Sequence, residues 1–189
     1  MPIRLDSADA DFEPRFQHLL DGKRESSQDV NDIVAGIIAD VRARGDDAVV
    51  ELTNRFDRNH FTAADLRIGE AEIDGAASRV TPEVRAALQT AHDRILAHHE
   101  KQKPEDHIYT DPIGVVLGTR WTPVDAVGIY VPGGLATYPS SVLMNAVPAR
   151  VAGVGRIAMV VPTPDGQVAA PLLLAARIAG ITEIYRIGG

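Results

Sequence analysis

The bend Pro132-Gly133-Gly134 is the segment whose residue types and spacing point most clearly to binding chemistry. It lies between a β-branched run and a helical stretch that begins near residue 140. Two residues without side chains let a ligand approach the backbone, and the amide donors and dipole of a helix N-terminus favour an anionic group such as a pyrophosphate. A plain tight turn is the competing interpretation, since the GxGxxG dinucleotide fingerprint is absent.

The histidines do not form a recognisable metal site. His92 and His99 are seven residues apart in a helical stretch, with His98 beside the latter, so two rings share a face. No acid accompanies them in an HExxH arrangement, and a zinc site needs further donors. We therefore expect packing or solvated histidines. The other three lie in polar surroundings and are expected at the surface: His18, His60 and His107.

Composition limits the classes of function. The chain has 189 residues, 45% of them hydrophobic, which is enough for one domain or two small ones. The formal charge of -7 and the lack of a basic stripe argue against nucleic acid as a partner. The absence of cysteine excludes disulfides, thiolate zinc sites and cysteine nucleophiles from this chain, and favours a reducing, cytoplasmic setting. No apolar stretch approaches the roughly 18 residues of a membrane span, and no export signal is recognisable.

The first half of the sequence has the period of helices. Ser26 and Ser27 are candidate caps and Gly45 a candidate stop for a helix with a regular apolar face. That face consists of Val30, Ile33, Val34, Ile37, Ile38 and Val41. A second helix is expected from Asp46 to about Phe56, and Thr81-Pro82-Glu83 has the residues of a third helix start. Phe56 and Trp121 are expected to anchor the core.

The polar stretch at 100–107 separates this half from a region where β-branched runs alternate with helices. Such alternation is typical of crossover units on a parallel sheet. Strands are expected at 115–121, 126–131, 157–161 and 183–187, with helices at 140–152 and 169–179. The predicted fold is α/β, with an N-terminal helical region and first strands over 1–125, followed over 126–189 by an incomplete Rossmann-like parallel sheet with helices on its faces.

Several motifs of this sequence are specific enough to compare with known families. They are "GIYVPGG", "YPSSVLMNAVPARVAGVGRIAMVVPTPDG" and "AGITEIYRIGG" within 126–189, and "ARGDDAVVELTNRFD" before them. These motifs resemble those of the histidinol dehydrogenases, closely over 126–189 and more loosely back to about residue 28. A more distant likeness to the aldehyde dehydrogenase superfamily lies in the helix that contains Pro148 and in the strand that ends in Pro162-Thr163-Pro164-Asp165.

The resemblance implies a homodimeric enzyme of histidine biosynthesis. Such enzymes oxidise L-histidinol to L-histidine through L-histidinal in two NAD-dependent hydride transfers, with a zinc ion that holds the substrate and a glutamate and a histidine as bases. The zinc ligands and this Glu-His pair are expected later than Gly189. No catalytic or metal residue is therefore assigned within this chain, which is expected to be inactive by itself.

The resemblance also selects a cofactor site. Tyr130 matches the family's cofactor-contacting tyrosine, and the loop after the next strand is expected to lie near the adenosine end by analogy with the superfamily. The predicted cofactor-binding residues are Tyr130, Pro132, Gly133, Gly134, Pro162 and Thr163.

Two other hypotheses stay open at this point. A related dehydrogenase could act on another small alcohol, such as a sulfonated diol, because the substrate-binding residues are expected outside this sequence. A non-catalytic interaction module is the alternative from a different class. Nucleotide binding separates the enzymes from the module.

Overall fold

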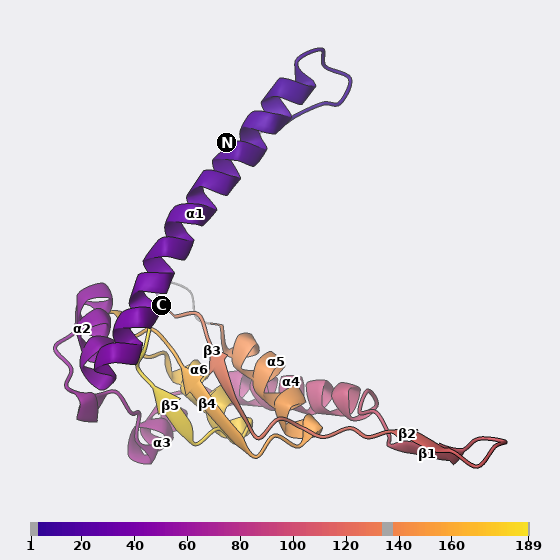
Figure 1. Ribbon diagram of the computed structural model, residues 1–189. Coiled ribbons are helices and arrows are strands. Elements are labelled where there is room, and N and C mark those ends of the chain that lie inside the picture. The colour runs from indigo at the N-terminus through magenta and orange to yellow at the C-terminus, as the bar shows by residue number, and fades with distance from the viewer. Residues whose placement is uncertain (1–3, 134–137, 189) are drawn as a thin grey trace. The chain divides into compact units, whose positions relative to one another are not determined.

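A computed structural model describes residues 4–133 and 138–188, with the side chains of 21–29 left outside the description (Figure 1). The chain divides into two compact units, and the division falls between Val49 and Val50. The expected start of an NAD-binding half at residue 126 lies within the second unit and stays a prediction. None of the described helices is both long enough and apolar enough to cross a membrane.

The first unit consists mainly of α1 (Phe12–Arg44), a helix of 33 residues. The prediction that Ser26 and Ser27 cap this helix is wrong, because the helix begins 14 residues before Ser26 and runs through both serines. Leucine, lysine, arginine and glutamate are common in the preceding stretch and are good helix formers. The predicted stop is confirmed at Gly45, which has φ 60° and donates its N–H to the Val41 carbonyl over 2.8 Å.

Further helices follow along the chain. They are α2 (Asp46–Asp57), the short 3-10 turn η1 (Ala63–Asp65), α3 (Glu70–Ser78) and α4 (Pro82–Glu100). The predicted start of α4 is confirmed, since the Thr81 hydroxyl accepts the Val84 N–H over 3.4 Å and a proline occupies the first position. Sequence reasoning missed α3, which is only nine residues long and contains a glycine.

A parallel sheet with strand order β3-β4-β5 forms the centre of the second unit (Figure 1). Its elements alternate along the chain: β3 (Ala126–Tyr130), α5 (Pro139–Ala152), β4 (Arg156–Val160), η2 (Pro164–Gly166), α6 (Ala170–Ile178) and β5 (Glu183–Tyr185). The predicted α/β class and the three parallel strands are confirmed, with ends that differ by one or two residues. Gly153 and Gly180 have positive φ where the two helices end, as the sequence indicates.

The core lies between one face of this sheet and the helices. Ile129, Met159 and Ile184 alternate with more exposed neighbours and are buried against α5 and α6. The other edge of β5 pairs with the segment before α3, where the Ile68 N–H donates to the Ile184 carbonyl over 2.9 Å. Helix packing and edge pairing therefore hold three short strands in one register.

The prediction that 115–121 joins the parallel sheet is wrong. β2 (Val116–Thr119) pairs instead with β1 (His107–Thr110) in an antiparallel hairpin. The turn explains this, because the Asp111 carboxylate accepts the Ile113 and Val115 N–H groups and Gly114 adopts φ 89°. These turn residues favour a local hairpin over a long crossover.

Two predicted core anchors are also wrong. Trp121 and Phe56 are 58% and 50% exposed. Trp121 directly follows the exposed hairpin, and the Arg55 guanidinium covers the Phe56 ring at 4.6 Å. A large aromatic side chain alone does not indicate burial.

Replacement of a fully buried leucine tests the position of the core. Leu173→Ala should lower the free energy of unfolding by about 2 to 5 kcal/mol, because it leaves a cavity under the sheet. Met144→Ala is the control, since Met144 on α5 is 63% exposed. Chemical denaturation followed by circular dichroism measures both. Equal losses in the two variants would contradict the assigned core.

Candidate functional site

A cavity of about 270 Å³ lies where β3 and β4 end and α6 begins. It is lined by Gly133, Val161, Pro162, Gln167, Val168, Ala169 and Leu172. In open parallel sheets, ligands bind outside the carboxyl ends of the strands, which is the edge where this cavity lies. The N-cap residue of α6 is Ala169, whose side chain has no oxygen and so does not itself cap the first turn.

The loops after β3 and β4 touch at Gly133. A Cβ atom on Gly133 would overlap with the Pro162 carbonyl oxygen and would crowd the Val161 side chain. The absence of a side chain at this glycine is therefore required by the neighbouring loop. The prediction that a ligand occupies this space is wrong, because the Pro162 backbone occupies it.

The predicted cofactor-binding residues do not all lie together. Gly133 and Pro162 line the cavity, whereas Thr163, the next residue in the chain, is fully buried and is not among the lining residues. Tyr130 is 52% exposed and, by strand alternation, points to the sheet face opposite that of the buried Ile129. Pro132 is exposed and is not among the lining residues. Gly134 lies outside the described residues.

Thr163 is held by two residues that sequence reasoning missed. Its N–H donates to Asp57 Oδ2 over 2.7 Å, and its carbonyl accepts from Asn59 Nδ2 over 3.0 Å. Its hydroxyl is buried and has no hydrogen-bond partner among the described residues. Both partners are themselves buried, so Thr163 has a fixed position with unused hydrogen-bonding capacity.

Arg58, between these two residues, reaches the same loop. Its guanidinium forms a bidentate ion pair with the Asp165 carboxylate, at 2.9 and 2.7 Å. This hydrogen bonding lowers the pKa of Asp165 and raises the pKa of Arg58. The sequence signal is the polar run Asp57-Arg58-Asn59 at the end of α2, of which only Asp57 belongs to the motif that carries the family resemblance.

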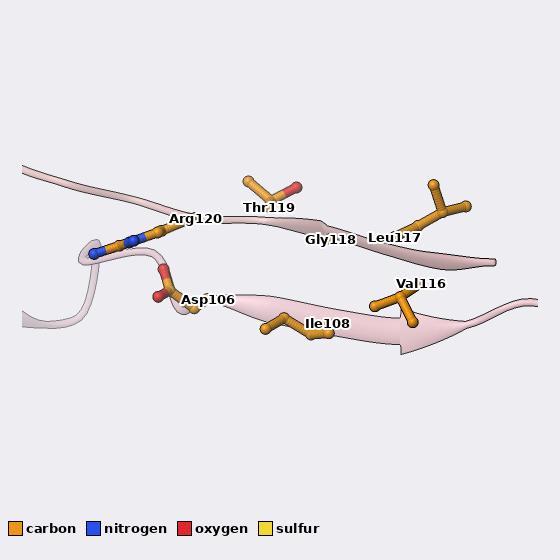
Figure 2. Close-up of a pocket in the computed structure, with 7 residues that line it drawn as sticks. All are labelled: Asp106, Ile108, Val116, Leu117, Gly118, Thr119 and Arg120. Atoms are coloured by element: carbon orange, nitrogen blue, oxygen red, sulfur yellow. The ribbon is translucent and has the colours of Figure 1, made fainter.

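A second hollow lies on the β1–β2 hairpin (Figure 2). Val116 and Leu117 lie toward the hairpin turn, and Asp106 and Arg120 lie at the other end. The Asp106 carboxylate accepts the Trp121 N–H over 2.7 Å and so helps to close the hairpin. The hollow lacks a helix N-terminus or a glycine bend, so the cavity beside β4 is the better nucleotide candidate.

Histidines and acids form no group of three or more that could bind a metal ion within the described residues. His92 Nδ1 lies 2.9 Å from Asp93 Oδ1 in a contact between sequence neighbours. The rings of His98 and His99 meet edge to face with centroids 5.2 Å apart. The surface positions predicted for His18, His60 and His107 are confirmed.

The alternation of parallel strands and helices, with a cavity at the carboxyl edge, defines a Rossmann-like α/β protein. A sequence profile described as histidinol dehydrogenase matches residues 20–189. This chain belongs to the histidinol dehydrogenase family.

Individual relatives support the same conclusion. Histidinol dehydrogenases of Ruegeria pomeroyi and Rhodospirillum rubrum are 60% and 56% identical to this chain over all 189 residues. The chain spans 44% of the length of each of these relatives. The crystal structure of histidinol dehydrogenase from Elizabethkingia anophelis matches with a TM-score of 0.80 and 33% identity, covering 85% of this chain and 37% of that one.

Alanine at Gly133 tests the contact between the two loops. Gly133→Ala should lower the melting temperature, because the new methyl group forces the Pro162 backbone away. Gly128→Ala is the matched control in the adjoining strand, since a Cβ there meets nothing within 4 Å. Thermal unfolding measures both. A Gly133→Ala protein as stable as the Gly128→Ala protein would refute the contact.

The Arg58–Asp165 pair predicts a pH dependence. Because the pKa of Asp165 is lowered in the folded protein, the pair contributes stability above the ordinary aspartate pKa and loses it as the pH falls through the lowered value. An NMR titration of the Asp165 carboxyl should show that lowered pKa, and Arg58→Ala should return it to the ordinary range. A titration unaffected by this substitution would contradict the ion pair.

Proposed function

We propose that this chain supplies the NAD-binding part of a zinc-requiring histidinol dehydrogenase that oxidises L-histidinol through L-histidinal to L-histidine. The observation that carries the proposal is the cavity at the carboxyl ends of β3 and β4 in a chain of this family. The activity belongs to a protein of the relatives' length, because the chain spans 44% of theirs. The relatives are named histidinol dehydrogenases, which supports L-histidinol as the substrate.

The residues around the cavity fit part of a dinucleotide. Its volume of about 270 Å³ is just below the range of whole small-molecule sites, roughly 300 to 1,000 Å³, so it suits one portion of NAD. The N-terminus of α6 favours an anionic group, and the exposed Gln167 amide offers hydrogen-bond donors. NAD, when bound, supplies the hydride acceptor, and this chain's residues bind and orient it.

We propose that the zinc ligands and the catalytic Glu-His pair lie in other parts of a protein of the relatives' length, as the family resemblance implies, since this chain spans 44% of that length. A homodimer and a cytoplasmic location are further parts of the proposal, supported by the family resemblance and by the absence of cysteine.

The proposed activity is tested in the full-length protein. Incubation with L-histidinol and NAD should produce NADH, and removal of zinc with a chelator should abolish the reaction until zinc is restored. Turnover of a sulfonated diol but not of L-histidinol would show that the substrate is the diol. A protein that binds neither nucleotide nor zinc would favour the interaction module.

Tyr130→Ala tests the predicted cofactor contact. Loss of a stacking ring worth about 1 kcal/mol should raise the KM for NAD in the full-length enzyme by about fivefold, with zinc content unchanged. Tyr109→Ala is the matched control, because Tyr109 is a similarly exposed tyrosine on the hairpin. Zinc loss in the Tyr130 variant, or equal KM values in both variants, would remove Tyr130 from the cofactor site.

A further inference from the structure

Three consecutive residues, Asp57, Arg58 and Asn59, hold the loop that follows β4. Asp57 and Asn59 bind the N–H and the carbonyl of Thr163 over 2.7 and 3.0 Å. Arg58 binds the carboxylate of Asp165 through two hydrogen bonds of 2.9 and 2.7 Å. We refer to these three residues as the clamp. The clamp fixes two positions of one loop from a segment more than 100 residues earlier in the sequence.

The clamped positions lie between two parts of the cavity wall. Pro162 lines the cavity directly before Thr163, and Gln167 and Val168 line it two and three residues after Asp165. A displacement of the clamped loop would therefore move the wall on both sides. No clamp residue is among those that line the cavity, so the clamp acts through the loop.

The end of β5 is connected to the same segment. An added Cβ on Gly188 would lie 3.3 Å from Asp57 Oδ1 and 3.3 Å from the Pro162 Cβ. Asp57 thus lies between the chain after β4 and the chain after β5. The buried Asp57 carboxylate therefore lies beside two neighbouring loops, at the edge of the sheet where ligands bind.

The exposed arm of the clamp has an unusual backbone. Arg58 and Asp165 are the two non-glycine residues with positive φ in the described parts of the chain, and both have φ 55°. Such conformations persist where the surroundings impose them, and they are common at ligand-binding sites. Their side chains remain 65% and 64% exposed, so the ion pair contributes little to global stability. The conformation therefore points to control of loop position.

We propose that Asp57, Arg58 and Asn59 are positioning residues that set the affinity for NAD by fixing the Pro162–Val168 wall of the cavity. This inference rests on the proposed function, namely that the nucleotide occupies this cavity. The clamp holds the loop in its binding geometry before the ligand arrives, which lowers the ordering cost of binding.

The exposed ion pair provides the sharpest test. In the full-length protein, Arg58→Ala and Asp165→Ala should each weaken NAD about three- to fivefold in equilibrium titrations, on the order expected for loss of one exposed ion pair. The melting temperature should change by no more than about 2 °C. The charge-swapped protein with both Arg58→Asp and Asp165→Arg should recover the affinity, because each residue type then occupies a left-handed position that it already adopts here.

Arg156→Ala is the matched control. Arg156 forms a similar bidentate pair with Glu183 at the other end of the sheet, so its loss should leave NAD affinity unchanged. If the wild type binds NAD and the Arg58 and Arg156 variants are alike, the clamp is refuted while the proposed function stands. Weakened single variants without recovery in the swapped protein also refute it, since the two side chains would then act separately. A wild type that binds no NAD overturns the proposed function itself.

Discussion

Burial of one face of the β3-β4-β5 sheet against α5 and α6 is the interaction on which the rest of the second unit depends. Alternate strand residues such as Ile129 and Met159 lose nearly all contact with solvent, and Leu172 to Ala176 on α6 do the same from the helix side. At about 25 cal/mol per Å² of buried apolar surface, this packing outweighs any single polar contact at the site. It brings the carboxyl ends of the three strands to one edge.

The loops at that edge are placed by different forces. The bend at Gly133 fits because a hydrogen atom leaves room for the Pro162 carbonyl. The loop after β4 is fixed by buried hydrogen bonds to Asp57 and Asn59. Polar groups that are removed from water cost much free energy if they have no hydrogen-bond partner, so these contacts are hard to break. The strands determine where the loops begin, and contacts from residues distant in sequence determine their course.

Much of the second unit could be predicted from sequence because periodicity and end signals are local. The runs around Ile129 and Met159, and the helix start at Thr81, carry their own information. The prediction for 115–121 is wrong because a β-branched run does not show which strand it pairs with. The clamp was missed because no local pattern shows that Arg58 reaches a residue 107 positions later. The need for glycine at position 133 could be predicted, but its cause is contact with the Pro162 carbonyl and not the approach of a ligand.

We propose above all that the dinucleotide lies at the carboxyl edge of β3 and β4. A crystal structure of the full-length protein with bound NAD tests this most directly. We expect nucleotide density against Gly133, Pro162 and the first turn of α6. Density for NAD at another face of the protein, with this cavity filled only by water, would contradict it.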